Sequence, residues 1–401
     1  MKPSCPNITY KELNAVNNVM KQRTLSSFVG ANHDGAMELL YMKSKDLNYW
    51  INGKTFLGGN YVRKFEADFA KMLNVDYAIS VNSATSGLIT ALLALKPDNR
   101  KKIITTPYSF TASAAAISLA GYTPIFVDIN PDTFILSERA IEEAIDDQTK
   151  AILHVSWCGN AGNLKKIKEI AEYHNITLIE DASQSILNKY NDEYIGTIGD
   201  IGVFSFNEPK NMTTGEGGMV VTNSETYAVR SRMIRNHGEA IPNIYNNIIH
   251  PDIIGYNFRL PEILAVIGIE QLKKLPALNK IRKLNYEYIL ENTKDIKALK
   301  PQVITNSEYY PYCMSFIVKN DGGGVLKRKI VNHLSEKNIP ISTGIPRLLH
   351  EHYCYNKENL PKYMKEAAYI WSAYISFFQI GYPNTVADME ELISALKEAT
   401  L

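Results

Sequence analysis

The strongest constraint on the fold is an alternation of short β-rich runs with helical stretches through the middle of the chain. The β-rich runs lie at 102–106, 123–128, 151–156, 177–180, 202–206 and 218–222. Stretches with the period of an amphipathic helix separate the first five runs, such as 111–119, 137–145 and 164–174. This order predicts an α/β fold with a mostly parallel sheet, in which buried strands have helices on both faces.

The pattern changes after about Leu275. A helical stretch at 262–282 leads into a segment with fewer apolar runs, a turn at 322–324 and a final helix at 387–399. The mixture is typical of a smaller α+β unit.

We therefore interpret residues 56–275 as a large domain, and residues 1–55 with 276–401 as a small domain. The length of 401 residues suits one large domain with a smaller companion. Residues 28–56 have no clear periodicity, and the sequence leaves their structure open.

The composition excludes several classes of partner. The chain has 43 basic and 42 acidic residues without blocks of one sign, so no nucleic acid or anionic membrane is expected to bind. The four cysteines are far apart, which favours a reducing compartment. No apolar run approaches the ~18 residues of a membrane span, and no signal segment is evident. We expect a cytoplasmic protein with a small-molecule partner.

Residues 202–218, GVFSFNEPKNMTTGEGG, present Lys210 in a turn between two β-rich runs. The glycines that follow it allow backbone to approach a neighbour closely. Most lysines in such turns are simply solvated. A lysine that forms a Schiff base must be neutral, and at a reference pKa of about 10.4 only about one in a few thousand is neutral at pH 7. The chemistry would therefore need a pocket that lowers the pKa of Lys210.

Asp181 directly follows an apolar run, where a carboxylate can point into a cleft. Pyridoxal phosphate (PLP) acts as an electron sink when a paired carboxylate keeps its ring nitrogen protonated. Glu180 would point to the opposite side of the strand. Gln184 is a candidate donor to the phenolic oxygen of the cofactor. Asp181 is equally compatible with a turn or a helix cap, and Gln184 with a loop cap.

Two further segments offer weaker candidates. Ser83 or Thr85 begins a helix, and free N–H groups and hydroxyls in a first helical turn form a natural phosphate site, although every good helix cap has this appearance. Phe110 follows a strand and could stack on an aromatic ring, although such a residue is more often part of the core.

Other chemistries have little support. The chain has no P-loop, dinucleotide-binding, H-E-x-x-H or G-x-S-x-G motif. His350, His352 and Cys354 suggest zinc, but histidines two positions apart on a helix point in different directions. We expect no metal.

Taken together, these segments resemble the DegT/DnrJ/EryC1/StrS family of sugar aminotransferases, which have the type I PLP fold. The resemblance runs from about Gly58 to Leu275 and is loose over the last 120 residues. Its segments occur in order: GGNYVRKFEADFA, NSATSGLITALLAL, PYSFTASAAAISLAGYTPIFVDI, IEDASQS, GTIGDIGVFSFNEPKNMTTGEGGMVVTN, RNHG and GYNFRLPEILAVIGIEQLKKL. It implies a large domain with a seven-stranded sheet.

The resemblance also implies roles for single residues. Lys210 matches the Schiff-base lysine, and Asp181 the partner of the pyridine nitrogen. Gln184 matches the residue at the phenolic oxygen, and Phe110 the ring that stacks on the cofactor. The segment Ser83, Ala84 and Thr85 matches the phosphate-binding turn, with Ser205 as a further phosphate contact.

Three other matches concern the partner subunit and the substrates. Asn257 matches an asparagine that reaches the phosphate from the neighbouring subunit, which implies a homodimer with shared active sites. Glu216 and Arg259 are expected on the substrate side. Related sugar 3-dehydratases have histidine where this chain has Lys210, so transamination is favoured over dehydration.

The expected reaction moves an amino group, in the resemblance from L-glutamate, onto a keto group of a nucleotide-linked deoxysugar. Two alternatives stay open at this point. The acceptor could be a keto-cyclitol or another keto-sugar, or the chain could be a regulatory protein that binds PLP or a sugar without catalysis.

Overall fold

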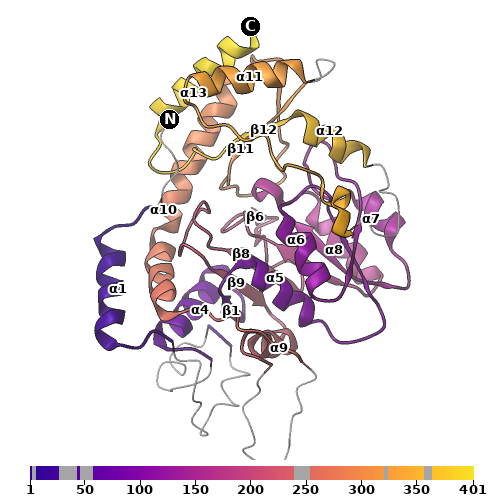
Figure 1. Ribbon diagram of the computed structural model, residues 1–401, viewed down its shortest axis with the longest axis vertical. Coiled ribbons are helices and arrows are strands. Elements are labelled where there is room, and N and C mark those ends of the chain that lie inside the picture. Colours follow the sequence, from indigo (N-terminus) through magenta and orange to yellow (C-terminus); the bar gives the residue numbers. More distant parts are fainter. Residues whose placement is uncertain (2–5, 27–42, 46–56, 239–252, 320–323, 356–363) are drawn as a thin grey trace, which may run out of the picture.

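The computed structural model describes residues 1, 6–26, 43–45, 57–238, 253–319, 324–355 and 364–401. A seven-stranded sheet, called the large sheet below, forms the centre of the molecule (Figure 1). Its strands, in spatial order, are β1 (Tyr77–Val81), β9 (Gly218–Thr222), β8 (Ile201–Ser205), β5 (Thr177–Asp181), β4 (Thr149–Val155), β2 (Lys102–Thr105) and β3 (Thr123–Phe126). β9 runs antiparallel to both of its neighbours, and the remaining neighbouring pairs are parallel.

Helices cover both faces of the large sheet. Successive side chains of a strand point to opposite faces, so apolar strands present an apolar surface on each face that helices bury. In β5, Leu178 belongs to the core on one face and Ile179 to the core on the other. The first face packs against α4 (Asn60–Leu73), α7 (Glu138–Ala144), α8 (Leu164–Tyr173) and the first half of α10 (Glu262–Asn292). The second packs against α5 (Ala84–Leu93), α6 (Thr111–Leu119) and α9 (Glu225–Arg235).

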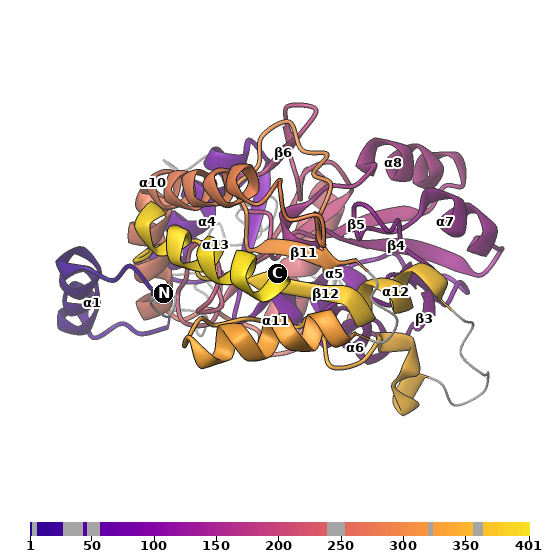
Figure 2. The ribbon, with the colours of Figure 1, turned by 90° about the horizontal axis from the view of Figure 1, so that it is seen from above.

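A second, antiparallel sheet of three strands, the small sheet, lies at the far end of α10 (Figures 1 and 2). It consists of β10 (Leu299–Pro301), β11 (Met314–Val318) and β12 (Tyr374–Phe377). The even-numbered residues of β11 pack against α11 (Val325–Glu336) and α13 (Val386–Thr400). Ile317, on its other face, packs with Tyr108 and Trp157 from the large-sheet region. A separate apolar cluster therefore packs the small sheet against loops of the large-sheet region.

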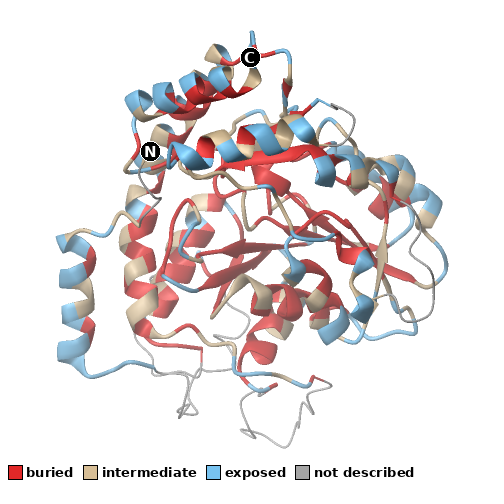
Figure 3. Cartoon of the chain, turned by 45° about the horizontal axis from the view of Figure 1, so that its top comes forward, coloured by how far each residue is buried: buried red, intermediate tan, exposed pale blue. Residues whose placement is uncertain are grey.

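The remaining elements are peripheral. The helix α1 (Tyr10–Gln22) packs against α10 and exposes its outer side (Figure 3). The short elements are α12 (Lys365–Ala373), the hairpin of β6 (Lys189–Tyr190) and β7 (Glu193–Tyr194), and 3-10 turns at Trp157–Gly159, Leu349–Glu351 and Tyr353–Tyr355. None of the helices in the described part of the chain combines the length and the apolarity that crossing a membrane would require.

The fold class expected from the sequence is confirmed: the protein is α/β with a mostly parallel seven-stranded sheet. All six expected runs are strands, within one or two residues. The expectation that all are buried is wrong for β3, because β3 is an edge strand, and Pro124 is tolerated there for the same reason. The sequence reading missed β1 and the small sheet. Most of residues 28–56, and Gly322 and Gly323, lie outside the described residues.

Candidate active site

A pocket of about 540 Å³ opens between the large sheet and the small sheet, at the carboxyl ends of the parallel strands. This edge is where ligands collect in such sheets. Most of the residues expected from the sequence line the pocket together: Ser83, Ala84, Thr85, Phe110, Asp181, Gln184, Ser205, Lys210 and Glu216. The pocket therefore brings together residues from positions 83 to 216.

Lys210 projects from the loop that joins β8 to β9. The Lys210 N–H donates to the carbonyl of Asn207 (3.0 Å), and the Thr213 hydroxyl donates to the carbonyl of Phe206 (3.0 Å). Gly215 has φ of +84°, a left-handed conformation that glycine adopts without strain. These contacts close the loop on itself and present Lys210 to the pocket.

The amine of Lys210 lies in a largely desolvated place, although the residue as a whole is half-buried. Burial lowers the pKa of Lys210 to about 8, and the negative charge of Asp181 opposes this shift. The Nζ atom lies 4.4 Å from the centre of the Tyr312 ring, a contact that favours the charged form. A neutral amine is therefore far more populated here than for a lysine in water.

Asp181 is the last residue of β5 and is 7% exposed. Its Oδ2 atom accepts a hydrogen bond from the Ser113 hydroxyl (3.0 Å), and its Oδ1 atom accepts one from the Ser183 N–H (3.2 Å). These two hydrogen bonds fix the direction of the carboxylate. Ser113 is a site residue that the sequence reading missed, although it lies in the segment that contains Phe110.

Glu180, next to Asp181, points to the opposite face of the large sheet, as expected. Its carboxylate accepts hydrogen bonds from the backbone N–H groups of Gly196 (2.7 Å), Ile198 (2.8 Å) and Gly199 (2.5 Å). Burial raises its pKa to about 7. Glu180 therefore holds the loop before β8, and its neighbour Asp181 faces the pocket.

Ser83 is the N-cap of α5, and its hydroxyl oxygen accepts a hydrogen bond from the Ser86 N–H (3.1 Å). The turn is packed tightly on β9, because a Cβ atom on Gly218 would lie 2.8 Å from the backbone of Ser83 and Ala84. The first turn of α5 therefore presents N–H groups and hydroxyls to the pocket at a fixed height above the large sheet.

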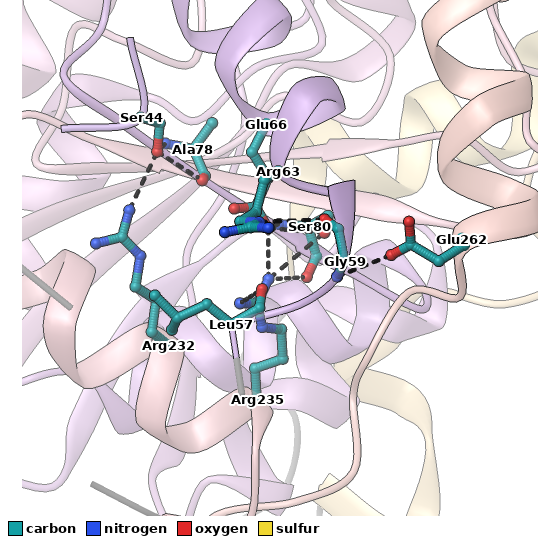
Figure 4. A network of polar contacts seen from close by, with 10 residues as sticks. All are labelled: Ser44, Leu57, Gly59, Arg63, Glu66, Ala78, Ser80, Arg232, Arg235 and Glu262. Carbon is teal, nitrogen blue, oxygen red and sulfur yellow. Dashed lines mark hydrogen bonds and ion pairs between the residues drawn. The ribbon is translucent and has the colours of Figure 1, made fainter. Parts of the chain in front are cut away.

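A buried charged network holds the strand that leads into this turn (Figure 4). The Oε1 atom of Glu66 accepts hydrogen bonds from the Ser80 N–H (2.9 Å) and hydroxyl (2.8 Å), and it pairs with Arg235 at the end of α9. The Arg235 guanidinium also donates to the Ser80 carbonyl (3.0 Å). Because all three side chains are buried, this network ties α4, β1 and α9 into one support for the Ser83 turn.

Gln184 is oriented by the backbone on the other side of the pocket. Its Oε1 atom accepts a hydrogen bond from the Cys158 N–H (2.7 Å), so the Nε2 group is the donor that remains.

The Sγ atoms of Cys158 and Cys313 lie 3.1 Å apart, and both thiols are buried beside Tyr374. Burial raises the pKa of the Cys313 thiol.

Strand β12 of the small sheet, the residue after it and the loop that follows α11 supply a wall of the pocket that the sequence reading missed. Its members are Ser342, Gly344, Ile345, Pro346, Tyr374, Ser376 and Phe378. Nothing in the local pattern of these residues distinguishes them from ordinary strand and loop residues, so only their position across from Lys210 identifies them.

Asn257 and Arg259 do not line the pocket. Asn257 is exposed, and its carbonyl accepts a hydrogen bond from the Asn82 side chain (3.4 Å), next to the Ser83 turn. The Arg259 guanidinium donates to the Asn236 side chain (2.8 Å). Glu216 lies at the pocket rim, where its carboxylate accepts a hydrogen bond from Asn207 (2.7 Å).

The segment with His350 and His352 forms 3-10 turns instead of the regular helix assumed in the sequence reading. His350 is buried and Cys354 is exposed. Across the described ranges, no three His, Cys, Asp or Glu side chains are grouped so as to hold a metal ion.

The comparison with known proteins gives one family. The sequence model of the DegT/DnrJ/EryC1/StrS aminotransferase family matches residues 42–395. The chain is 35% identical over 290 residues to the GDP-perosamine synthase of Escherichia coli O157:H7, covering 72% of this chain and 76% of that protein. It is 33% identical over 267 residues to the UDP-4-amino-4,6-dideoxy-N-acetyl-beta-L-altrosamine transaminase of Helicobacter pylori, covering 65% and 70%.

A solved structure gives the same result. The GDP-4-keto-6-deoxy-D-mannose-3-dehydratase of Escherichia coli, with bound hydrated PLP, superposes with a TM-score of 0.82 at 25% identity. The superposition covers 99% of this chain and 100% of that one. The resemblance expected from the sequence is therefore confirmed, and it extends over the last 120 residues as well.

Proposed function

The chain belongs to the DegT/DnrJ/EryC1/StrS aminotransferase family and is a PLP-dependent aminotransferase, and on that premise we propose that it aminates a keto group of a nucleotide-linked deoxysugar. The observation that carries the proposal is one pocket lined by Lys210, Asp181 and the Ser83 turn. Lys210 is also the residue that distinguishes this chain from the histidine-bearing dehydratases, which favours transamination.

The side chains of the pocket fit PLP group by group. Hydroxyls of Ser83, Thr85 and Ser205, with the first turn of α5, suit a phosphate dianion. The buried carboxylate of Asp181 suits a protonated ring nitrogen, and the Nε2 group of Gln184 suits the phenolic oxygen. Phe110, which is 67% exposed and lines the pocket, suits the face of the ring.

When bound, PLP supplies an aldehyde that takes up the amino group and a protonated ring that accepts electrons. Lys210 holds the cofactor and, once displaced, takes the proton from the Cα atom of the amino donor. Asp181 keeps the ring nitrogen protonated, held in place by Ser113 and Ser183. Glu216, at the rim, is positioned for the substrate side.

The donor and the acceptor are identified by a two-stage experiment. L-glutamate is expected to bleach the yellow PLP-loaded protein, and a keto-sugar nucleotide is expected to restore the colour. A panel of keto-sugar nucleotides and keto-cyclitols, with 2-oxoglutarate release as the measurement, then ranks the acceptors. A yellow protein that no amino donor bleaches would contradict the function, and a preference for keto-cyclitols would favour the alternative acceptor.

The pKa of Lys210 makes a prediction about cofactor loading. Only the neutral amine attacks the aldehyde, so below pH 8 the rate constant for PLP loading of the apoprotein should rise about tenfold per pH unit. Because burial lowers the pKa of Lys210 to about 8, the rise should level off near that pH. Stopped-flow absorbance at a fixed PLP concentration measures this profile. A rise that continues to pH 10 would show that the amine is solvated.

We also propose a homodimer with shared active sites. Asn257 is exposed, lies next to the Ser83 turn and does not line the pocket of its own chain, so it is free to face a partner's phosphate site. Tyr256 and Phe258 stack beside it, with ring centres 4.8 Å apart, and Tyr256 is 41% exposed. Arg259 follows on the same segment and would approach the partner's substrate.

Two further expectations, one about the cellular compartment and one about the domain boundaries, belong to the same proposal. The cysteines of the described residues are free thiols, which supports a reducing compartment such as the cytoplasm. We propose a large domain, 56–275, and a small domain, 1–55 with 276–401. The two separate sheets that α10 joins support the division between 56–275 and 276–401.

A further inference from the structure

A second cavity, called the outer groove below, lies directly beside the active-site pocket. Its lining includes Lys327, Arg328, Thr343, Tyr369, Trp371 and Ser372. Its volume of about 490 Å³ falls within the roughly 300–1,000 Å³ of small-molecule sites. Ile345 and Pro346 line both the outer groove and the active-site pocket, so the two cavities share one wall.

The charged residues that line the described part of the outer groove are basic. Lys327 and Arg328 line it, and none of its described lining residues is acidic. The Lys327 ammonium donates to the carbonyls of Ser372 (3.0 Å) and Trp371 (3.4 Å), which anchors it at the end of α12. An ammonium has three N–H donors, so one remains for a ligand. An anchored, half-buried cation is well suited to a phosphate group.

The outer groove also has an aromatic wall. Tyr369 and Trp371 of α12 are each 38% exposed. The Trp371 indole N–H donates to the carbonyl of Ile345 (2.9 Å), so the ring is held in place and its polar atom is satisfied. A fixed aromatic ring offers a face on which a nucleobase stacks at little entropic cost. Lys327 could serve only to cap the end of α12. That structural role does not account for the aromatic side chains and the second basic side chain that line the same groove.

We propose that the outer groove binds the nucleoside diphosphate portion of the amino acceptor. The base stacks on Trp371, the diphosphate lies against Lys327 and Arg328, and the sugar passes Ile345 into the active-site pocket. This inference rests on the proposed function, because it assigns a place to the nucleotide of a nucleotide-linked sugar. It makes the small domain the part of the chain that selects the substrate.

The experiment measures binding of GDP and of UDP to the PLP-loaded enzyme by isothermal titration calorimetry. Loss of base stacking is worth roughly 10-fold or more in affinity, so Trp371→Ala should raise the Kd of the preferred nucleotide by about that factor. Lys327→Met should also weaken binding, and the loss should shrink at high salt. Trp371→Phe keeps a stacking face and should retain most of the affinity.

Lys329→Met is the matched control, because Lys329 is exposed on the same helix and is not among the lining residues of the outer groove. Its Kd should equal that of the wild type. The yellow colour of each variant reports that it is folded and loaded with cofactor.

Each result separates this inference from the proposed function. Nucleotide binding that neither Trp371→Ala nor Lys327→Met weakens would overturn the inference while leaving transamination intact, and so would a wild type that binds neither GDP nor UDP. A wild type that L-glutamate does not bleach would instead overturn the function, and the titrations would still decide whether the outer groove binds nucleotides.

Discussion

Replacing Lys210 by alanine is expected to lower transamination by about 10⁴-fold or more, because one amine both holds the cofactor and moves the proton. The variant should also lose the absorption band that a lysine-linked cofactor shows near the edge of the visible range. The fold should persist, because the Lys210 side chain lines the pocket and is not part of the hydrophobic core of the large sheet. Absorbance after dialysis, and 2-oxoglutarate release with an accepted keto-sugar nucleotide, measure the two effects.

Lys71→Ala is the control for this experiment, because Lys71 is exposed on α4 and does not line the pocket. It should keep both the absorption band and the turnover. A Lys210→Ala protein that still carries the band would mean that another lysine holds the cofactor.

Replacing Asp181 by asparagine is expected to leave cofactor binding largely intact and to slow turnover by roughly 10²–10⁴-fold, the range that a correctly placed proton is worth. Asparagine has nearly the same shape, and its amide oxygen still accepts from Ser113 or Ser183. It has no charge to keep the ring nitrogen protonated. Measurement of kcat together with the Kd for PLP separates the two effects.

Glu180→Gln is the matched control, one residue away on the opposite face of the large sheet. Glutamine has one acceptor oxygen where three backbone N–H groups need partners, so the free energy of unfolding should fall by about 1–3 kcal/mol. The turnover of the folded protein should stay close to that of the wild type. If Asp181→Asn lost stability and kept its turnover, Asp181 would be a structural residue.

Much of the fold and of the site is readable from short segments. The period of the hydrophobic pattern identified six strands of the large sheet and most of the helices around it, because these strands and helices mostly alternate along the chain. It missed β1, whose five buried residues lie directly before the Ser83 turn. It also missed the small sheet, whose strands lie among irregular loops and do not follow the regular alternation of the large sheet.

Burial was less predictable than secondary structure. β3 was expected to be a buried strand and lies at the edge of the large sheet. Strand order depends on which crossover places each strand, and the apolar composition of the run does not contain that information. The buried network of Glu66, Ser80 and Arg235 joins segments up to 169 residues apart, so no local pattern could identify it.

The regular alternation of strands and helices in the sequence determined by itself where the chemistry would lie. Parallel strands end at one edge, so residues after successive strands, such as Asp181 and Lys210, converge there. Tertiary structure alone decided how those residues behave. Burial between the two sheets lowers the pKa of Lys210 to about 8, and the segments around the small sheet supply the facing wall and the outer groove beside it. Desolvation and cavities arise from packing between segments that are distant in sequence, and a linear pattern does not record that packing.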